Sequence, residues 1–352
     1  MKKTREKFIG CLLGGSIGDA LGYPVEFLKI NEICDKYGTN GIGDLKVNRF
    51  SGNALISDDT QMTLFTVEGI LNFENKRKNG EDISISECIF YSYERWLHTQ
   101  GYPISKEYKY LLKDVSSPLF QYEELFSQKA PGNSCITALV RAKNNKFGTI
   151  ENRINKSKGC GGVMRAAPAG LYFMNKNKDA FNLGCELAAI THGHPTGYLS
   201  AGAFASIISD LCASLSIEDA VKNAIKILED MESSEETINA LKKAVFLAKD
   251  GNPGPEKLSQ LGEGWISEEA LSIAIYCTLS YPEDFEKALR LSVNHSGDSD
   301  STGSICGNIL GVKLGLESIP KQWIDKLELS ELTKEMAEKL YNNVESKTHK
   351  KE

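Results

Sequence analysis

The stretch FIGCLLGGSIGDALG at residues 8–22 spaces its apolar side chains as an α-helix does. They would share one broad helical face, and they are Phe8, Ile9, Leu12, Leu13, Ile17 and Leu21. Met62, Phe65, Ile70 and Phe73 nearly repeat the pattern. Further helices are expected at 197–214, 217–230, 234–249, 267–279, 284–294, 303–316 and 330–346. Strand-like alternation is rare, so the sequence predicts an all-α fold of a dozen or so helices.

The chain has 352 residues, which permits one large domain or two ordinary ones. No Pro- or Ser-rich linker divides it, and the best boundary candidate is the loop at 251–264. Residues with suggestive chemistry lie on both sides of that loop. We therefore predict a single domain over 1–345, followed by a disordered tail at 346–352.

Composition limits the function classes. A net charge of -6 and a pI near 5.6 argue against a nucleic-acid binder, although helix starts can hold a small anion without basic charge. None of the nine cysteines has C-x-x-C spacing, which favours free thiols in the cytoplasm.

The N-terminal apolar run superficially suggests a signal peptide, but four glycines interrupt it before Asp19. No stretch approaches the roughly 18 apolar residues of a membrane span, so we expect no membrane association.

Two acidic segments stand out, Ser57-Asp58-Asp59-Thr60 and the run at 297–303, each before an expected helix. Serine and aspartate are good helix caps, so either segment alone has an ordinary explanation. A cap needs one such residue, however, whereas every position from Asp298 to Thr302 carries a hydroxyl or a carboxylate. Brought together, these carboxylates would repel one another unless a cation were present. Hard oxygen ligands suit Mg²⁺, Mn²⁺ or Ca²⁺.

Familiar alternatives to this reading fail on specific residues. An EF-hand starting at Asp298 would need a glutamate where Ile309 stands, and a P-loop would need a lysine after the glycine. The glycine-rich GCGGVMR at 159–165 is no dinucleotide fingerprint, because Met164 replaces the third glycine. Such a loop is either a tight turn or a place where backbone amides approach a pyrophosphate.

Seven segments, taken together, resemble the ADP-ribosylglycohydrolase family and follow its order along the chain. They are GCLLGGSIGDALGYPVE (10–26), SDDTQMTL (57–64), PGNSC (131–135), NKSKGCGGVMRAAPAGL (155–171), THGHPTGYL (191–199), GEGW (262–265) and GDSDSTG (297–303). The resemblance implies a single-domain helical bundle with a central dimetal cleft. It also implies hydrolysis of ADP-ribose from a modified acceptor.

The resemblance further implies a set of metal ligands for two Mg²⁺ ions, with Mn²⁺ as the alternative. These are Ser57, Asp58, Asp59, Asp298, Asp300 and Ser301. Serine at the first and last of these positions, together with HPTGYL and GDSDST, is closer to the arginine-specific branch of the family.

Substrate-binding residues implied in the same way are Gly159, Gly161, Gly162, Met164, His192 and Gly264. The glycine loop would hold the diphosphate, and Arg165 would face inward to support a carboxylate. Without the resemblance, His192 is equally a hydrogen-bonded core histidine. Glu26 or Asp59 would take a proton from the attacking water or assist the leaving group, and the sequence does not assign these roles.

The resemblance implies a hydrolase that removes ADP-ribose from modified protein, most specifically from arginine, and releases free ADP-ribose. We expect it to be a monomer. One alternative keeps the fold but changes the linkage, to serine, O-acetyl-ADP-ribose or a nucleic-acid base. Another is a catalytically silent binding or structural homologue, which retention of all six ligand positions and Glu26 disfavours.

Overall fold

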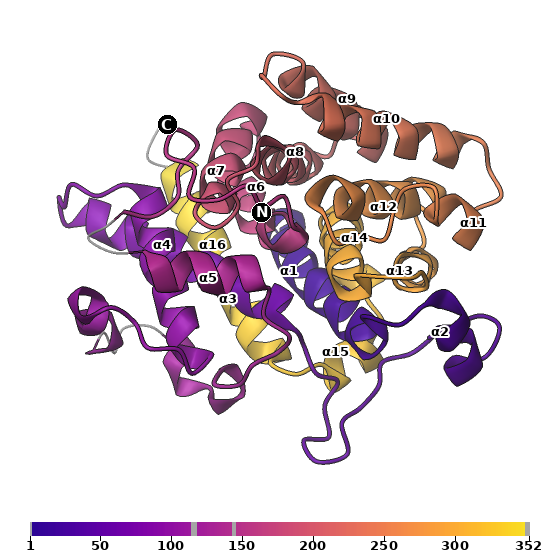
Figure 1. Ribbon diagram of the computed structural model, residues 1–352, viewed down its shortest axis with the longest axis horizontal. Helices are drawn as coiled ribbons and strands as arrows, with labels where there is room; N and C mark the ends of the chain where they lie inside the picture. The colour runs from indigo at the N-terminus through magenta and orange to yellow at the C-terminus, as the bar shows by residue number, and fades with distance from the viewer. Residues whose placement is uncertain (1, 114–117, 143–145, 349–352) are drawn as a thin grey trace.

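The structure is a computed structural model that describes residues 2–113, 118–142 and 146–348. These residues form helices joined by loops (Figure 1), without a strand among them, so the predicted all-α fold is confirmed. The α-helices are α1 (Lys2–Gly22), α2 (Ile30–Tyr37), α3 (Asp58–Lys78), α4 (Ile85–Thr99), α5 (Asn133–Arg141), α6 (Ala167–Tyr172), α7 (Asn177–Ala189), α8 (Pro195–Cys212), α9 (Ile217–Leu228), α10 (Glu235–Lys249), α11 (Pro255–Leu258), α12 (Ser267–Ser280), α13 (Phe285–Val293), α14 (Ser299–Leu314), α15 (Lys321–Lys326) and α16 (Ser330–Thr348). The 3-10 helices are η1 (Tyr23–Val25), η2 (Lys106–Lys113), η3 (Pro118–Gln121), η4 (Glu123–Leu125), η5 (Cys160–Gly162) and η6 (Leu316–Ser318).

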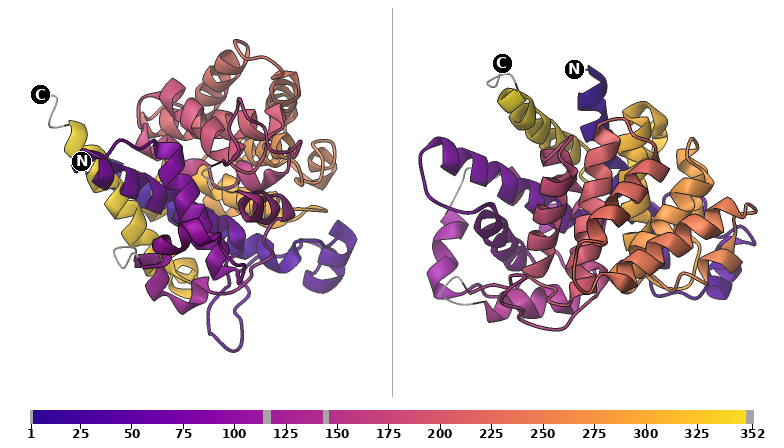
Figure 2. Two further views of the ribbon diagram at one scale, coloured as in Figure 1. Left: turned by 60° about the vertical axis from the view of Figure 1, so that its left-hand side comes forward. Right: turned by 90° about the horizontal axis from the view of Figure 1, so that it is seen from above.

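Helices α1 and α14 lie side by side at the centre of the molecule (Figures 1 and 2). Their contact consists of glycines on both helices, namely Gly10, Gly14, Gly18 and Gly22 of α1 and Gly303, Gly307 and Gly311 of α14. A Cβ atom placed on Gly18 would lie 1.9 Å from the Gly303 carbonyl oxygen, and one on Gly307 would lie 2.0 Å from that of Gly14. The two backbones therefore touch directly, which accounts for the glycines that interrupt the first apolar run.

By length and composition alone, Lys3–Val25 could cross a membrane, with a mean hydropathy of 1.2. The prediction that no stretch comes close to this is therefore wrong. Within the protein, 89% of this window is buried, which is the environment of a central core helix.

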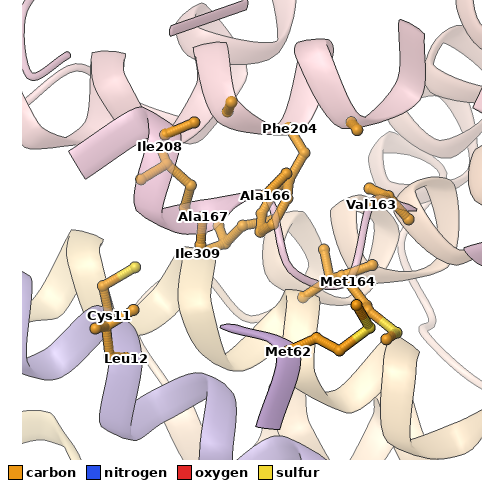
Figure 3. Packing of buried hydrophobic residues seen from close by; sticks show 14 of the residues in the cluster. Cys11, Leu12, Met62, Val163, Met164, Ala166, Ala167, Phe204, Ile208 and Ile309 are labelled. Carbon is orange, nitrogen blue, oxygen red and sulfur yellow. The ribbon is translucent and has the colours of Figure 1, made fainter. Parts of the chain in front are cut away.

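The core is continuous from α8 to α14. Every residue of α8 is buried. Figure 3 shows Phe204 and Ile208 of α8 packed over Ala166 and Ala167, with Ile309 of α14 close by. Burial of this apolar surface is the main driving force that holds the helices together.

Several predicted boundaries shift. Helix α14 begins at Ser299, not at residue 303, and α16 continues to Thr348. The tail predicted from 346 is thus helical at its start, where Lys347 Nζ lies 2.8 Å from Glu74 Oε1, and residues 349–352 lie outside the described ranges. Helices α10 and α12, on either side of the loop at 251–264, pack against each other.

Candidate active site

The predicted site residues converge on one cavity of about 310 Å³. Those that line it are Glu26, Asp58, Asp59, Asp298, Asp300, Ser301, Gly159, Gly161, Met164 and His192. Three others do not. Ser57 is fully buried behind Asp59, while Gly162 faces Ala188 and Gly264 faces Thr302 and Asp298.

A larger cavity of about 580 Å³ is lined by Arg153, Lys156 and His194 among others, but by no carboxylate. We assign the active site to the smaller cavity, because the carboxylates line it.

The start of α3 is held from two directions. Ser57 caps the helix by accepting a hydrogen bond from the Asp59 backbone N–H at 3.2 Å. Asp19, inside α1, accepts hydrogen bonds from the Ser57 N–H at 2.9 Å and the Thr60 N–H at 3.1 Å. Asp19 of α1 therefore braces the start of a different helix. Asp58 in turn accepts from the Gly132 N–H at 3.2 Å.

The start of α14 brings the second acidic segment to the same place. Asp298 caps the helix by accepting from the Ser301 N–H at 3.2 Å, so Asp300 and Ser301 lie in its first turn. The Ser301 hydroxyl donates to Asp59 Oδ2 at 3.3 Å and so joins the two segments. The tertiary contact inferred from sequence is present.

The cavity is strongly acidic. In the described ranges no lysine or arginine lines it. Burial, followed by repulsion from Asp300, raises the pKa of Asp19 to about 7 and that of Glu26 to about 11. The same two causes hold the pKa values of Asp58 and Asp59 well above the usual range.

Two buried carboxylate oxygens in this cavity, Glu26 Oε2 and Asp59 Oδ1, accept no hydrogen bond from any residue that the structure describes. An unpaired buried oxygen of this kind is costly unless a cation or donor reaches it. Among the described residues, no group of three or more His, Cys, Asp or Glu side chains is arranged as a ready-made cation site. The chemistry of the donor set thus fits hard cations, and the arrangement of the side chains does not by itself define their positions.

The glycine loop forms another wall. A Cβ atom on Gly161 would lie 2.9 Å from Cys135 Sγ and 3.0 Å from His192 Cε1, so no side chain fits there. Arg165 is fully buried beneath the loop and donates to the Gly161 carbonyl, to Tyr93 Oη at 2.9 Å and to Thr191 Oγ1 at 2.7 Å. No carboxylate is among the partners that Arg165 shows, so its predicted role as a carboxylate support is wrong. It supports the loop instead.

His192 is a buried, neutral histidine in the cavity wall. Its Nδ1 lies 2.8 Å from Thr191 Oγ1, and burial followed by the charge of Arg165 lowers its pKa to about 3. His194 points elsewhere, because its Nδ1 accepts from the Thr196 N–H at 3.2 Å and caps α8. The two histidines therefore do not form a pair.

Besides residues 130–135, sequence reasoning missed three side chains of this cavity. Phe27 and Trp265 line it and stack with ring centroids 5.3 Å apart. The Cys160 thiol donates to Asp298 Oδ2 at 2.7 Å. Trp265 lies in the GEGW motif and Cys160 in the glycine-rich stretch at 159–165, whereas none of the quoted motifs contains Phe27.

We expect Gly161→Val to weaken binding of ADP-ribose by tenfold or more, an order-of-magnitude estimate, because a side chain would displace His192 and block close approach of the backbone. Isothermal titration calorimetry measures the effect. Gly43→Ala is the matched control, since Gly43 is exposed and the nearest atom to a Cβ there would be Arg290 Nε at 3.9 Å, an ordinary contact distance. Equal affinity in a folded Gly161→Val protein would reduce the loop to a simple turn.

Comparisons with known proteins agree with this geometry. The sequence profile of ADP-ribosylglycohydrolase matches residues 1–350. The chain is 26% identical over 330 residues to ADP-ribosyl-[dinitrogen reductase] glycohydrolase of Rhodospirillum rubrum, covering 93% of this chain and 92% of that protein. It is 22% identical to ADP-ribosylarginine hydrolase Tri1 of Serratia proteamaculans, over 96% of this chain and 80% of that protein.

The fold has a solved counterpart. An ADP-ribosylglycohydrolase-related protein complex superposes with a TM-score of 0.65 at 21% identity, covering 98% of this chain and 100% of that chain. With the match of the profile along nearly the whole sequence, this means that the chain belongs to the ADP-ribosylglycohydrolase family.

Proposed function

We propose that this protein hydrolyses the N-glycosidic bond between ADP-ribose and a modified arginine side chain, with the help of two divalent cations. The observation that carries the proposal is the cavity itself. Carboxylates from the starts of α3 and α14 and from Glu26 face it, and the glycine loop forms an adjoining wall. Such a site pairs acid–base groups with a binding surface for phosphate.

The cation ligands proposed are Ser57, Asp58, Asp59, Asp298, Asp300 and Ser301. The unpaired oxygen of Asp59 and the absence of any cationic side chain along the described cavity wall support them. Oxygen ligands favour Mg²⁺ or Mn²⁺ over Zn²⁺. When bound, the two ions would supply Lewis-acid activation of the ribose and of a water molecule.

The remaining roles fall to groups of the chain. The guanidinium of the substrate leaves as a neutral guanidine, and Glu26, whose carboxyl faces the cavity, is the group placed to give it a proton as it departs. With the cations bound, the Asp59 carboxylate would accept the proton of the attacking water. Amides of the glycine loop bind the diphosphate, and neutral His192 borders it without adding charge.

The name of the Serratia relative supports arginine as the acceptor, as do the two serines among the proposed ligands. The test incubates the protein with matched peptides carrying ADP-ribosylarginine or ADP-ribosylserine, and with O-acetyl-ADP-ribose, with Mg²⁺ or with a chelator. We expect release of ADP-ribose from the arginine peptide only with Mg²⁺. Preference for another conjugate would contradict the acceptor, and binding without release would favour the catalytically silent alternative.

Without a divalent cation, we expect the protein to lose stability as the pH rises from about 5 to about 8. The pKa values of Asp19 and Glu26 are raised in the folded state, so the folded protein binds these protons more tightly than the unfolded chain does. That stabilisation is complete below the unfolded values near 4 and is lost as the pH rises through the folded values. Thermal unfolding with a chelator should show a lower Tm at the higher pH.

Excess Mg²⁺ should reverse the loss, so the gain in Tm on adding Mg²⁺ should grow with pH. Glu26→Gln removes one of the two groups and should flatten the slope measured in chelator. A Tm gain that is independent of pH would mean that Mg²⁺ binds away from these carboxylates.

A further inference from the structure

Two aromatic side chains that the proposed reaction leaves unused lie at the mouth of the cavity. The rings of Phe27 and Trp265 stack with centroids 5.3 Å apart and an interplanar angle of 22°. Phe27 is 65% exposed and Trp265 36%. Of the large exposed hydrophobic side chains in the described ranges, these two line the acidic cavity. The pair therefore offers aromatic surface next to the carboxylates.

The backbone holds Phe27 in an unusual conformation. Its φ is 67°, in the left-handed region that a bulky residue seldom adopts. Glycine or asparagine would be accommodated there at lower cost. Phe27 directly follows Glu26, so this conformation sets the ring against Trp265 while the Glu26 carboxyl faces the cavity.

Trp265 is fixed from the opposite side. Its carbonyl accepts a hydrogen bond from the Cys160 N–H at 3.2 Å, which ties it to the glycine loop. A salt bridge of 2.7 Å between Lys29 and Glu263 joins the segment that follows Phe27 to the segment that carries Trp265. The aromatic pair is thus held in place before any ligand binds, which lowers the entropic cost of using it.

We propose that the Phe27–Trp265 pair is the acceptor subsite and receives the guanidinium plane of the modified arginine. The inference rests on the proposed function, because it places the leaving group beside Glu26, the acid that protonates it. A guanidinium is planar and cationic, and it stacks on aromatic faces. A serine linkage offers neither the plane nor the charge.

The first test measures kcat/KM on matched ADP-ribosylarginine and ADP-ribosylserine peptides. Phe27→Ala should lower the arginine value about tenfold and leave the serine value unchanged, since a partly exposed cation–aromatic contact is of that size. Phe27→Tyr should restore it. Phe246→Ala is the matched control, because Phe246 is 70% exposed on α10 and does not line the cavity. Thermal unfolding should be unchanged in all three variants.

The second test needs no catalysis. The chain has three tryptophans, and Trp96 and Trp323 are at most 1% exposed, so ligand-induced changes in fluorescence report on Trp265. Agmatine, added to the protein in excess Mg²⁺ and ADP-ribose, should quench this signal. Butylamine, a cation without a plane, should not. Trp265→Phe should abolish the response.

Three results would overturn the subsite. They are an arginine-to-serine ratio unchanged in Phe27→Ala, equal quenching by agmatine and butylamine, and loss of affinity for free ADP-ribose in Phe27→Ala, which would assign the pair to the nucleotide. Failure of the wild-type protein to cleave the arginine peptide would instead overturn the proposed acceptor. The two failures are therefore distinguishable.

Discussion

Asp300→Asn is expected to abolish release of ADP-ribose while the protein remains folded. Asparagine keeps the shape and one acceptor oxygen of Asp300 but removes a full negative charge from a site that is only 2% exposed. If Asp300 helps to hold a cation, the loss of charge removes activation of the water, and we expect a fall in kcat of roughly a thousandfold or more. Hydrolysis of ADP-ribosylarginine peptide in saturating Mg²⁺ measures it.

The alternative role of Asp300 is that of a helix cap, and the structure argues against it. The capping residue of α14 is Asp298, so Asp300 is not needed as a cap. Asp284→Asn, at the capping position of α13, is the matched control, because asparagine caps as well as aspartate does. In chelator, Asp300→Asn should raise the Tm, since the pKa of Asp300 is raised by burial and by Asp298. Near wild-type turnover would leave the cation assignment without support.

Gly307→Ala is expected to have the largest effect on stability. Alanine is worth about 1 kcal/mol more than glycine inside a helix, which alone would stabilise α14. Here, however, the added Cβ would lie 2.0 Å from the Gly14 carbonyl oxygen, a backbone atom that cannot move aside cheaply. The cost of overpacking exceeds the gain in helix propensity, and we expect the free energy of unfolding to fall by about 3 kcal/mol.

Chemical denaturation measures that loss. Gly254→Ala is the control, since a Cβ there meets no atom within 4 Å. Because α1 carries Asp19 and α14 carries Asp298 and Asp300, the Gly307 variant should also lose Mg²⁺ affinity. An unchanged denaturation midpoint would mean that α1 and α14 move apart to admit the added methyl group with no loss of stability.

The site residues that could be predicted from sequence are those whose local pattern is not explained by local structure, such as helix capping, alone. The run from Asp298 to Thr302 holds more oxygen ligands than a cap requires, and the structure places it in the cavity wall. The start of α14 was misplaced at residue 303, because the first turn consists of polar residues and carries no apolar periodicity.

Roles that depend on distant partners were not predictable. Asp19 lies in one helix and its hydrogen-bond partners begin at Ser57, at the start of another, and no local pattern in the sequence predicts this contact. Arg165 was assigned a carboxylate, but its partners are a carbonyl and hydroxyls brought together by folding. The pairing of Phe27 with Trp265 depends on the positive φ of Phe27, which no pattern in the sequence predicts.

The glycine contact between α1 and α14 also bears on how the protein is made. Most of helix α1 lies in Lys3–Val25, a segment whose mean hydropathy is high enough for a membrane span. The glycines of α14 against which α1 packs extend to Gly311. At ~5–20 residues per second, that partner is synthesised roughly 15–60 s later. Throughout this interval the nascent chain carries an apolar helix with no glycine surface to close against. Factors that recognise hydrophobic segments at the ribosome therefore have ample time to bind it, and the helix can reach its native place only late in translation.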